Sequence, residues 1–281
     1  MHPILFDLPL PFGRHLAFPA YGTFLVLGML TAAWVSARHG GALRIRRRDA
    51  FDLGVWLLAA ALVGAHLFHV AYYPEAYFEG GLGAGLKRAL TPGAGLVYYG
   101  GLAFAFPVLW IWGRHRRVPY LDLLDFVAPL GALGLAITRI GCFLNGCCYG
   151  VPSGMPWAVR FPAGSLPQLG QVEAGLVTPF ERSLPIEPVQ LFEAAVALAL
   201  FGWLWVRFPR RRFRGELVVA FGIGYGLWRI LAEALRADAP GWRPGELTAT
   251  PSQWVSLAAI TVSLVAGWRL RSASTPPSAR L

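Results

Sequence analysis

One arginine, one asparagine and all three cysteines of the chain lie within thirteen residues at the end of an apolar run. Residues 138–150 read TRIGCFLNGCCYG and contain Arg139 and Asn145. In or beside a bilayer every polar group needs a partner, so this concentration of polar residues indicates a functional site. The competing interpretation is a helix end capped by Asn145 and Gly146, with Arg139 reaching toward lipid headgroups.

A second polar group has helical spacing. Arg229, Glu233 and Arg236 lie at i, i+4 and i+7, so they share one face of a helix. The two arginines of this group, together with Arg139, offer planar, permanently charged forks suited to a phosphate group. Glu233 can hold Arg229 in place or act as a general base. The alternative is an ion pair that merely joins the helix of Arg229 to that of Arg139.

The remaining unusual polar residues fall at the same depth of the expected helices. An ion pathway would place ionisable groups through the full depth of the bilayer, whereas one depth near the outer headgroups fits a reaction on lipid. The residues that lie at this depth, besides Arg139, Arg229 and Glu233, are Tyr21, Tyr99, Asn145, Gln190 and Glu193.

Two further signals are weaker. The pair Gly100 and Gly101 would let a helix or a lipid headgroup approach the backbone closely. His66 and His69, at i and i+3 with no nearby carboxylate, make a poor zinc site. We expect no metal and no diffusible cofactor for this protein.

The cysteines favour a structural role over a catalytic one. A disulfide between Cys142 and either Cys147 or Cys148 is possible, whereas a bond between the two adjacent cysteines would be strained.

Composition places these residues in a membrane protein. Of the 281 residues 56% are hydrophobic and only 14% are charged, against about 25% charged in soluble domains. The apolar residues form long blocks that match bilayer-spanning helices. We therefore predict an all-α polytopic protein with seven transmembrane helices, at about residues 16–36, 51–72, 95–112, 121–144, 188–208, 216–235 and 251–268.

The net charge of +10 encodes topology. Sixteen of the 25 basic residues lie in four clusters, at 38–48, 114–117, 207–214 and 269–280. These clusters alternate along the connections, which is typical of a positive-inside bias and not of a nucleic-acid surface. The N-terminus is then outside and the C-terminus cytoplasmic.

The expected domain organisation follows from these helices. Residues 1–270 form a single membrane domain, in which 146–187 are an extracytoplasmic head insertion with a hairpin near 157–161. Residues 73–92 form an outer loop, and 271–281 form a basic cytoplasmic tail.

The motifs along the whole chain resemble the prolipoprotein diacylglyceryl transferase family, a family of bacterial membrane enzymes. The resemblance rests on the order of several short motifs: Tyr21-Gly22, Gly64-Ala65, Tyr99-Gly100-Gly101, RIGCFLNG from Arg139, Tyr149-Gly150, PVQLFE ending at Glu193, and GYGLWRILAE ending at Glu233, followed by Arg236.

This resemblance implies an activity and its partners. The family transfers the diacylglyceryl group of phosphatidylglycerol to the lipobox cysteine in the signal peptide of a preprolipoprotein, and glycerol phosphate leaves. The active site would face the outer leaflet of the bacterial cytoplasmic membrane. Membrane lipid and the signal peptide are the expected partners, and nucleic acid is not.

The resemblance also implies roles for individual residues. Arg139 and Arg229 would bind the phosphate, and Tyr99 would stand at the position of the base. Glu233 would have a positioning or polarising role. The substrate-binding residues would be Tyr21, Gly100, Gly101, Asn145, Gly150, Gln190, Glu193, Tyr225 and Arg236.

This chain departs from the family pattern at several positions. Tyr99 occupies the place of a histidine proposed as the base, and Cys142 and Cys147 replace an asparagine and an acid. Glu187 replaces a histidine. Two alternatives therefore stay open: a paralogue that modifies a different acceptor, and a lipid transporter or flippase.

Overall fold

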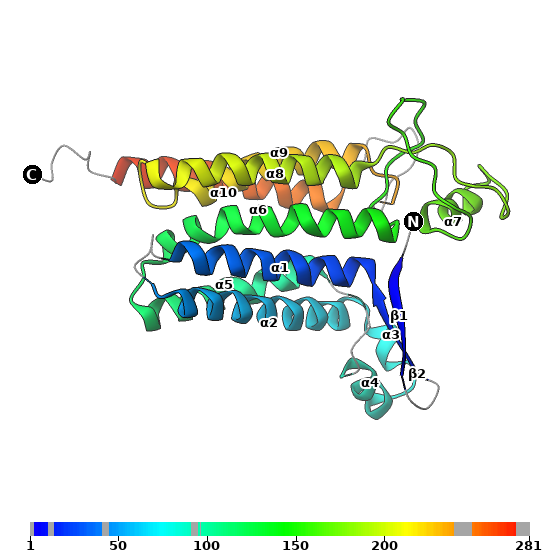
Figure 1. Ribbon diagram of the computed structural model, residues 1–281, viewed down its shortest axis with the longest axis horizontal. Coiled ribbons are helices and arrows are strands. Elements are labelled where there is room, and N and C mark those ends of the chain that lie inside the picture. Colours follow the sequence, from blue (N-terminus) through cyan, green and yellow to red (C-terminus); the bar gives the residue numbers. More distant parts are fainter. Residues whose placement is uncertain are drawn as a thin grey trace, which may run out of the picture. The chain divides into compact units, whose positions relative to one another are not determined.

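The structure is a computed structural model, and it describes residues 3–10, 14–40, 45–90, 95, 97–238 and 249–273. It is mostly helical (Figure 1). The helices and strands, in chain order, are β1 (Ile4–Leu10), β2 (Arg14–Pro19), α1 (Ala20–His39), α2 (Arg47–Tyr72), α3 (Pro74–Phe78), α4 (Leu82–Ala89), α5 (Tyr98–Arg116), α6 (Tyr120–Asn145), α7 (Leu166–Glu173), α8 (Val189–Arg207), the 3-10 turn η3 (Phe208–Arg210), α9 (Glu216–Ala234) and α10 (Pro251–Ala273).

Each of the seven predicted long helices is present as a helix. By length and composition, α1, α2, α6, α9 and the α8–η3 segment could span a membrane. Large apolar side chains such as Trp56, Leu198 and Val262 are exposed along the helices, where lipid would cover them. The chain is therefore a helical membrane protein.

The prediction was wrong at the N-terminus. The first helix begins at Ala20 and not near residue 16, because β1 and β2 form an antiparallel two-stranded sheet. Both strands are edges, which tolerate the prolines that a central strand would exclude. The helix α10 continues to Ala273, and residues 274–281 of the predicted tail lie outside the described residues.

The two predicted outer segments also differ from expectation. The described part of the 73–92 loop folds into the short helices α3 and α4. In the head, Val159 makes only an isolated bridge with Ile186, and the described residues there form the helix α7 instead of a hairpin. The alternation near 157–161 is too short to specify a hairpin without a second paired strand.

The chain divides into two compact units. One contains Ala33–Leu123, and the other contains Met1–Ala32 with Leu124–Leu281. In the first unit α2 packs against α5. The two helices approach so closely that a Cβ on Gly100 would collide with the backbone oxygen of Gly64. Arg46 and Arg116 both pair with Asp49 at the start of α2, at 3.0 and 2.9 Å.

The second unit is built around α6, α8, α9 and α10. The helix α9 packs against both α8 and α10, which run beside it in Figure 1. Glycines also allow α1 to lie close to α6. A Cβ on Gly28 would lie only 2.7 Å from the backbone oxygen of Gly134. Small residues allow such close approach where no hydrophobic force drives helices together.

Buried Asp125 fixes the beginning of α9. Its carboxylate accepts hydrogen bonds from the backbone N–H groups of Gly215 and Leu217, each at 2.8 Å, and of Val218 at 3.2 Å. These donors have no partner inside α9, so an acid at this position satisfies them and suits the helix dipole.

A candidate anion site at the end of the helices

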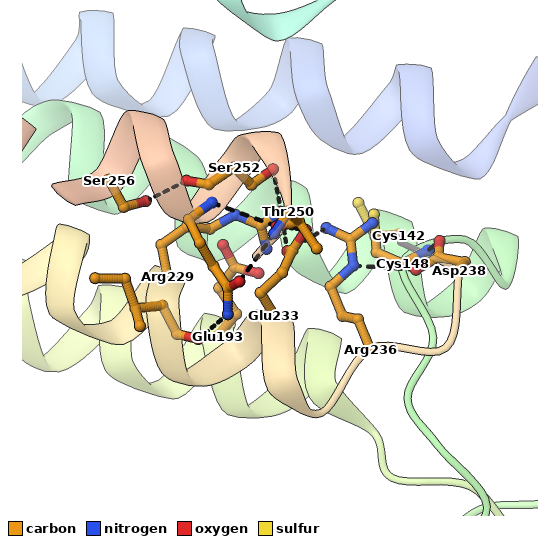
Figure 2. Close-up of polar contacts among 12 residues, drawn as sticks. Cys142, Cys148, Glu193, Arg229, Glu233, Arg236, Asp238, Thr250, Ser252 and Ser256 are labelled. Carbon is orange, nitrogen blue, oxygen red and sulfur yellow. Dashed lines mark hydrogen bonds and ion pairs between the residues drawn. The ribbon is translucent and has the colours of Figure 1, made fainter. Parts of the chain in front are cut away.

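Three arginines and three acids meet at the ends of α6, α8 and α9. Arg139 Nη2 lies 2.9 Å from Glu193 Oε1, and Arg229 Nη2 lies 2.6 Å from Glu233 Oε2. Arg236 Nε lies 3.0 Å from Asp238 Oδ1. Figure 2 shows Glu193, Arg229, Glu233, Arg236 and Asp238 together. Because the positive and negative charges balance, the cluster can be buried without a large net charge.

The two glutamates hold the arginines in fixed orientations. Glu193 is 1% exposed and also accepts a hydrogen bond from the Tyr225 hydroxyl at 2.8 Å. Glu233, 2% exposed, accepts a hydrogen bond from Thr250 Oγ1 at 2.9 Å, and Arg236 Nη1 lies 3.8 Å from its other oxygen. Both acids therefore act within a network and not as isolated ion pairs.

The arginine network is incomplete. Within the described residues, Arg139 Nε and Arg229 Nη1 are buried N–H donors with no hydrogen-bond partner. Buried donors are normally satisfied, and leaving one unpaired is costly. Each of the two guanidinium groups can therefore still donate to an acceptor of an anion, and a phosphate has the number and geometry of acceptors that arginine forks match.

Backbone contacts position the segment that carries Arg236. Gly150 pairs with Arg236 in an antiparallel bridge, flanked by hydrogen bonds from Val151 N to Leu235 O and from Ala237 N to Tyr149 O. A Cβ on Gly150 would collide with the backbone oxygen of Glu187. Gly150 therefore lets the end of the 138–150 stretch lie against both chain segments.

Asp238 connects Arg236 to the cysteines. Its Oδ2 accepts a hydrogen bond from the Cys148 backbone N–H at 2.8 Å. Burial raises the pKa of Asp238 above its ordinary value, and the positive charge of Arg236 opposes that shift. Arg236 therefore favours the charged form of this carboxylate.

The cysteines themselves lie beside Arg139. Arg139 Nη1 is 3.8 Å from Cys142 Sγ, and Gln190 Nε2 donates to the backbone oxygen of Cys147 at 2.8 Å. None of the three cysteines is in a disulfide, and their sulfur atoms all lie within 4.8 Å of one another.

Most of the predicted site residues converge. The structure brings together Arg139, Gln190, Glu193, Tyr225, Arg229, Glu233 and Arg236. Asn145 is the half-buried last residue of α6, and Tyr21 is half-buried in the first turn of α1. The backbone oxygen of Ala20, beside Tyr21, would lie 3.0 Å from a Cβ on Gly141, so this turn packs on the last turns of α6.

Three predicted residues belong to the other unit. Tyr99, Gly100 and Gly101 lie in the first turn of α5. Gly100 is packed against Gly64, and a Cβ on Gly101 would lie 3.1 Å from the backbone oxygen of Ala61. Both glycines thus serve helix packing, and their contact with lipid stays a prediction.

Sequence reasoning missed three polar partners of the cluster. Thr250 binds Glu233, Ser252 Oγ accepts a hydrogen bond from Arg229 Nη2 at 3.3 Å, and Asp238 binds Arg236. Thr250 and Ser252 flank Pro251, the first residue of α10. A threonine followed by proline is a common helix-start signal, and it could have pointed to this end of α10.

These features define a class of protein, a helical membrane protein with a buried, incompletely satisfied arginine cluster at one end of its helices. Comparison with known proteins narrows the class. Residues 3–269 match the family model of prolipoprotein diacylglyceryl transferase.

Similar proteins carry the name phosphatidylglycerol–prolipoprotein diacylglyceryl transferase. The protein of Cupriavidus metallidurans is 30% identical over 89% of this chain and 88% of its own length. That of Nitratidesulfovibrio vulgaris (strain Miyazaki F) is 29% identical over 94% of each chain, and that of Bordetella avium is 32% identical over 78% of this chain and 76% of its own. The chain belongs to the prolipoprotein diacylglyceryl transferase family.

Proposed function

We propose that this protein transfers the diacylglyceryl group of phosphatidylglycerol to the lipobox cysteine of preprolipoproteins and releases glycerol phosphate. The observation that carries the proposal, beside family membership, is the pair of buried guanidinium donors on Arg139 and Arg229 that have no partner among the described residues. A phosphate is the reacting group of that lipid, and those two donors could hold it.

Charge stabilisation is the main contribution of the site. As the bond between the glyceryl carbon and the phosphate oxygen breaks, negative charge develops on the phosphate. Arg139 and Arg229 are held by Glu193 and Glu233 before the substrate arrives, so no reorganisation is needed when that charge forms. Arg236, near Glu233, adds a third positive charge.

The other site residues have supporting roles in this proposal. Tyr225 orients Glu193 through its hydroxyl, while Tyr21, Asn145 and Gln190 line the headgroup region. Gly150 keeps the backbone close to Arg236. Tyr99, at the position of the base, relays the proton of the acceptor thiol to solvent, because that thiol must become a thiolate to attack.

The proposed topology has seven spans, with α5 and α10 crossing the bilayer as well as the five apolar helices. The N-terminus lies outside and the anion site faces the outer leaflet of the cytoplasmic membrane. One observation supports this orientation. The arginine-rich residues 207–214 lie at the opposite end of α9 from Glu233, and basic clusters favour the cytoplasmic side.

A reconstituted assay tests the function. Purified protein in phosphatidylglycerol vesicles is given a lipobox peptide, and lipid-modified peptide and released glycerol phosphate are measured together. We expect turnover in the wild type, little in Arg139→Ala and reduced turnover in Tyr99→Phe. Arg207→Ala, at the opposite end of α8 from Glu193, is the matched control. Lipid movement without glycerol phosphate release would instead identify a flippase.

A different acceptor is the second candidate, motivated by Tyr99, Cys142 and Cys147 at positions where the family pattern has other residues. In that case the peptide assay gives no turnover although a histidine-bearing relative works under the same conditions. A genome that encodes such a relative beside this chain would favour this candidate.

A further inference from the structure

The three cysteines are brought to one point by the fold. All three sulfur atoms lie within 4.8 Å of one another. A tetrahedral ion with Zn–S bonds of about 2.3 Å keeps its sulfur ligands about 3.8 Å apart. The spacing of Cys142, Cys147 and Cys148 is therefore compatible with one shared metal ion.

The backbone of this segment is shaped for that convergence. Gly146 at φ 81° ends α6, and Cys148 adopts φ 58°, which residues other than glycine rarely do. Such a conformation persists only where the surroundings hold it. Here Asp238 accepts the hydrogen bond of the Cys148 N–H, and Gln190 binds the Cys147 carbonyl.

The surrounding charges suit a thiolate metal centre. Three thiolates and one divalent cation carry a net charge of −1, which needs a positive neighbour when buried. Arg139 Nη1 lies 3.8 Å from Cys142 Sγ, and Arg236 is held next to Cys148 through Asp238. The arginine cluster can thus balance the charge of the loaded centre.

The number of ligands is informative. The potential metal-binding group among the described residues contains three ligands and no fourth. Structural zinc sites have four protein ligands, whereas three leave a position open for a reacting group. Cys147 and Cys148 are only half-buried, so a substrate sulfur could approach.

We propose that Cys142, Cys147 and Cys148 bind a thiophilic divalent cation, Zn²⁺ by preference, whose open fourth position takes the acceptor cysteine as a thiolate. The binding of the acceptor cysteine at the open position rests on the proposed function, whereas the metal site itself does not.

The acceptor thiol gives its proton to solvent as its sulfur binds the ion, because coordination deprotonates a thiol outright. The sulfur then forms a bond to the glyceryl carbon and leaves the ion. The bond between that carbon and the phosphate oxygen breaks, and the phosphate keeps the electron pair beside Arg139 and Arg229.

The first test is metal content. Protein purified without a polyhistidine tag is analysed for zinc by mass spectrometry, and its thiols are titrated before and after a strong chelator. We expect about one zinc per chain and thiols that react only after chelation. Cys142→Ser and Cys147→Ser should lower zinc affinity at least about 10-fold. Arg207→Ala should retain the metal.

A second test examines the open position without requiring turnover. Co²⁺ replaces Zn²⁺, and the thiolate-to-cobalt charge-transfer absorption is followed while a lipobox peptide is added. The peptide with cysteine should change this absorption, and the same peptide with serine should not. A change seen even in protein that transfers no lipid would support the site while arguing against the proposed function.

Three results would overturn the proposal. One is a disulfide that involves Cys142, seen as thiols that appear only on reduction. Another is wild-type protein that binds no zinc when zinc is added and still has three reactive thiols. The third is full lipid transfer by metal-free protein, which would remove the role in thiol activation while the proposed function stands.

Discussion

Two regions of the same unit place buried acids beside arginines, and they treat their polar groups differently. Near the start of α6, both oxygens of Asp125 accept backbone hydrogen bonds, and Arg211 Nε lies 3.5 Å away. Near the end of α6, Arg139 and Arg229 each keep a buried donor that has no partner among the described residues.

The difference separates structure from function. A buried polar group that is fully hydrogen-bonded contributes to the fold and needs nothing more. A buried cation with an unused donor carries a free-energy cost that a bound anion can remove. The two regions therefore differ in what they need from outside the protein, although their residue types are alike.

The largest expected effect belongs to Asp125. Asp125→Ala leaves the first N–H groups of α9 buried without an acceptor and Arg211 without this partner, so we expect about 3 kcal/mol of lost stability. Thermal unfolding in detergent measures it. Transfer activity per folded molecule should stay at the wild-type level, and a selective loss of activity would contradict the structural assignment.

The next effect is catalytic. Arg229→Ala removes one orphaned donor and one charge, and we expect kcat/KM to fall about 100-fold, or about 2.7 kcal/mol. The unfolding temperature should fall as well, because Glu233 then keeps Thr250 and the more distant Arg236 as partners, so activity is measured per folded molecule. Arg229→Lys is the matched variant, since it keeps the charge without the fork. Equal activity of wild type and Arg229→Ala would remove Arg229 from the anion site.

The substitution Glu233→Gln tests whether the charge of Glu233 orients the neighbouring arginines. The amide keeps the shape and the contact with Thr250 but loses the charge that orients Arg229 and Arg236. We expect kcat to fall about 10-fold, as for a lost positioning interaction, with a smaller change in KM. Steady-state kinetics with varied phosphatidylglycerol separate the two parameters. A rise in KM alone would assign Glu233 to substrate binding and not to orientation.

The smallest effect is expected at Arg207. Its Nε lies 2.7 Å from Glu216 Oε1, yet its side chain is 24% exposed. Glu216 also accepts a hydrogen bond from the backbone N–H of Arg212, so its carboxylate keeps a partner when Arg207 is removed, and we expect a loss of stability of about 1 kcal/mol. Arg207→Ala should leave transfer activity unchanged and lower the unfolding temperature slightly. A large loss of activity would show that the two regions are linked more tightly than their contacts indicate.

Much of the fold could be predicted from the sequence. Long apolar blocks and basic connections located all seven long helices, because lipid leaves the backbone few alternatives. The strands β1 and β2 and the helices α3, α4 and α7 were not foreseen. Their sequences are short and weakly patterned, so contacts with the rest of the chain decide their conformation.

Most residues of the site could be predicted from the sequence, but the contacts between them from one helix to another could not. The spacing of Arg229, Glu233 and Arg236 placed them on one face, and the ion pair of Arg229 with Glu233 is present. Sequence alone did not show that Arg139 pairs with Glu193, 54 positions later in the chain. Local periodicity carries no information about contacts between helices.

By itself the sequence determined a helical membrane protein with a polar group at one depth, because the bilayer imposes long apolar segments and confines charges. Only the tertiary structure decided which charges are satisfied and which are not. It paired both oxygens of Asp125 with backbone donors, left one donor each on Arg139 and Arg229 without a partner among the described residues, and gathered three sulfur atoms. Such distinctions depend on distances of a few ångströms between segments far apart in the chain, which only the packed structure sets.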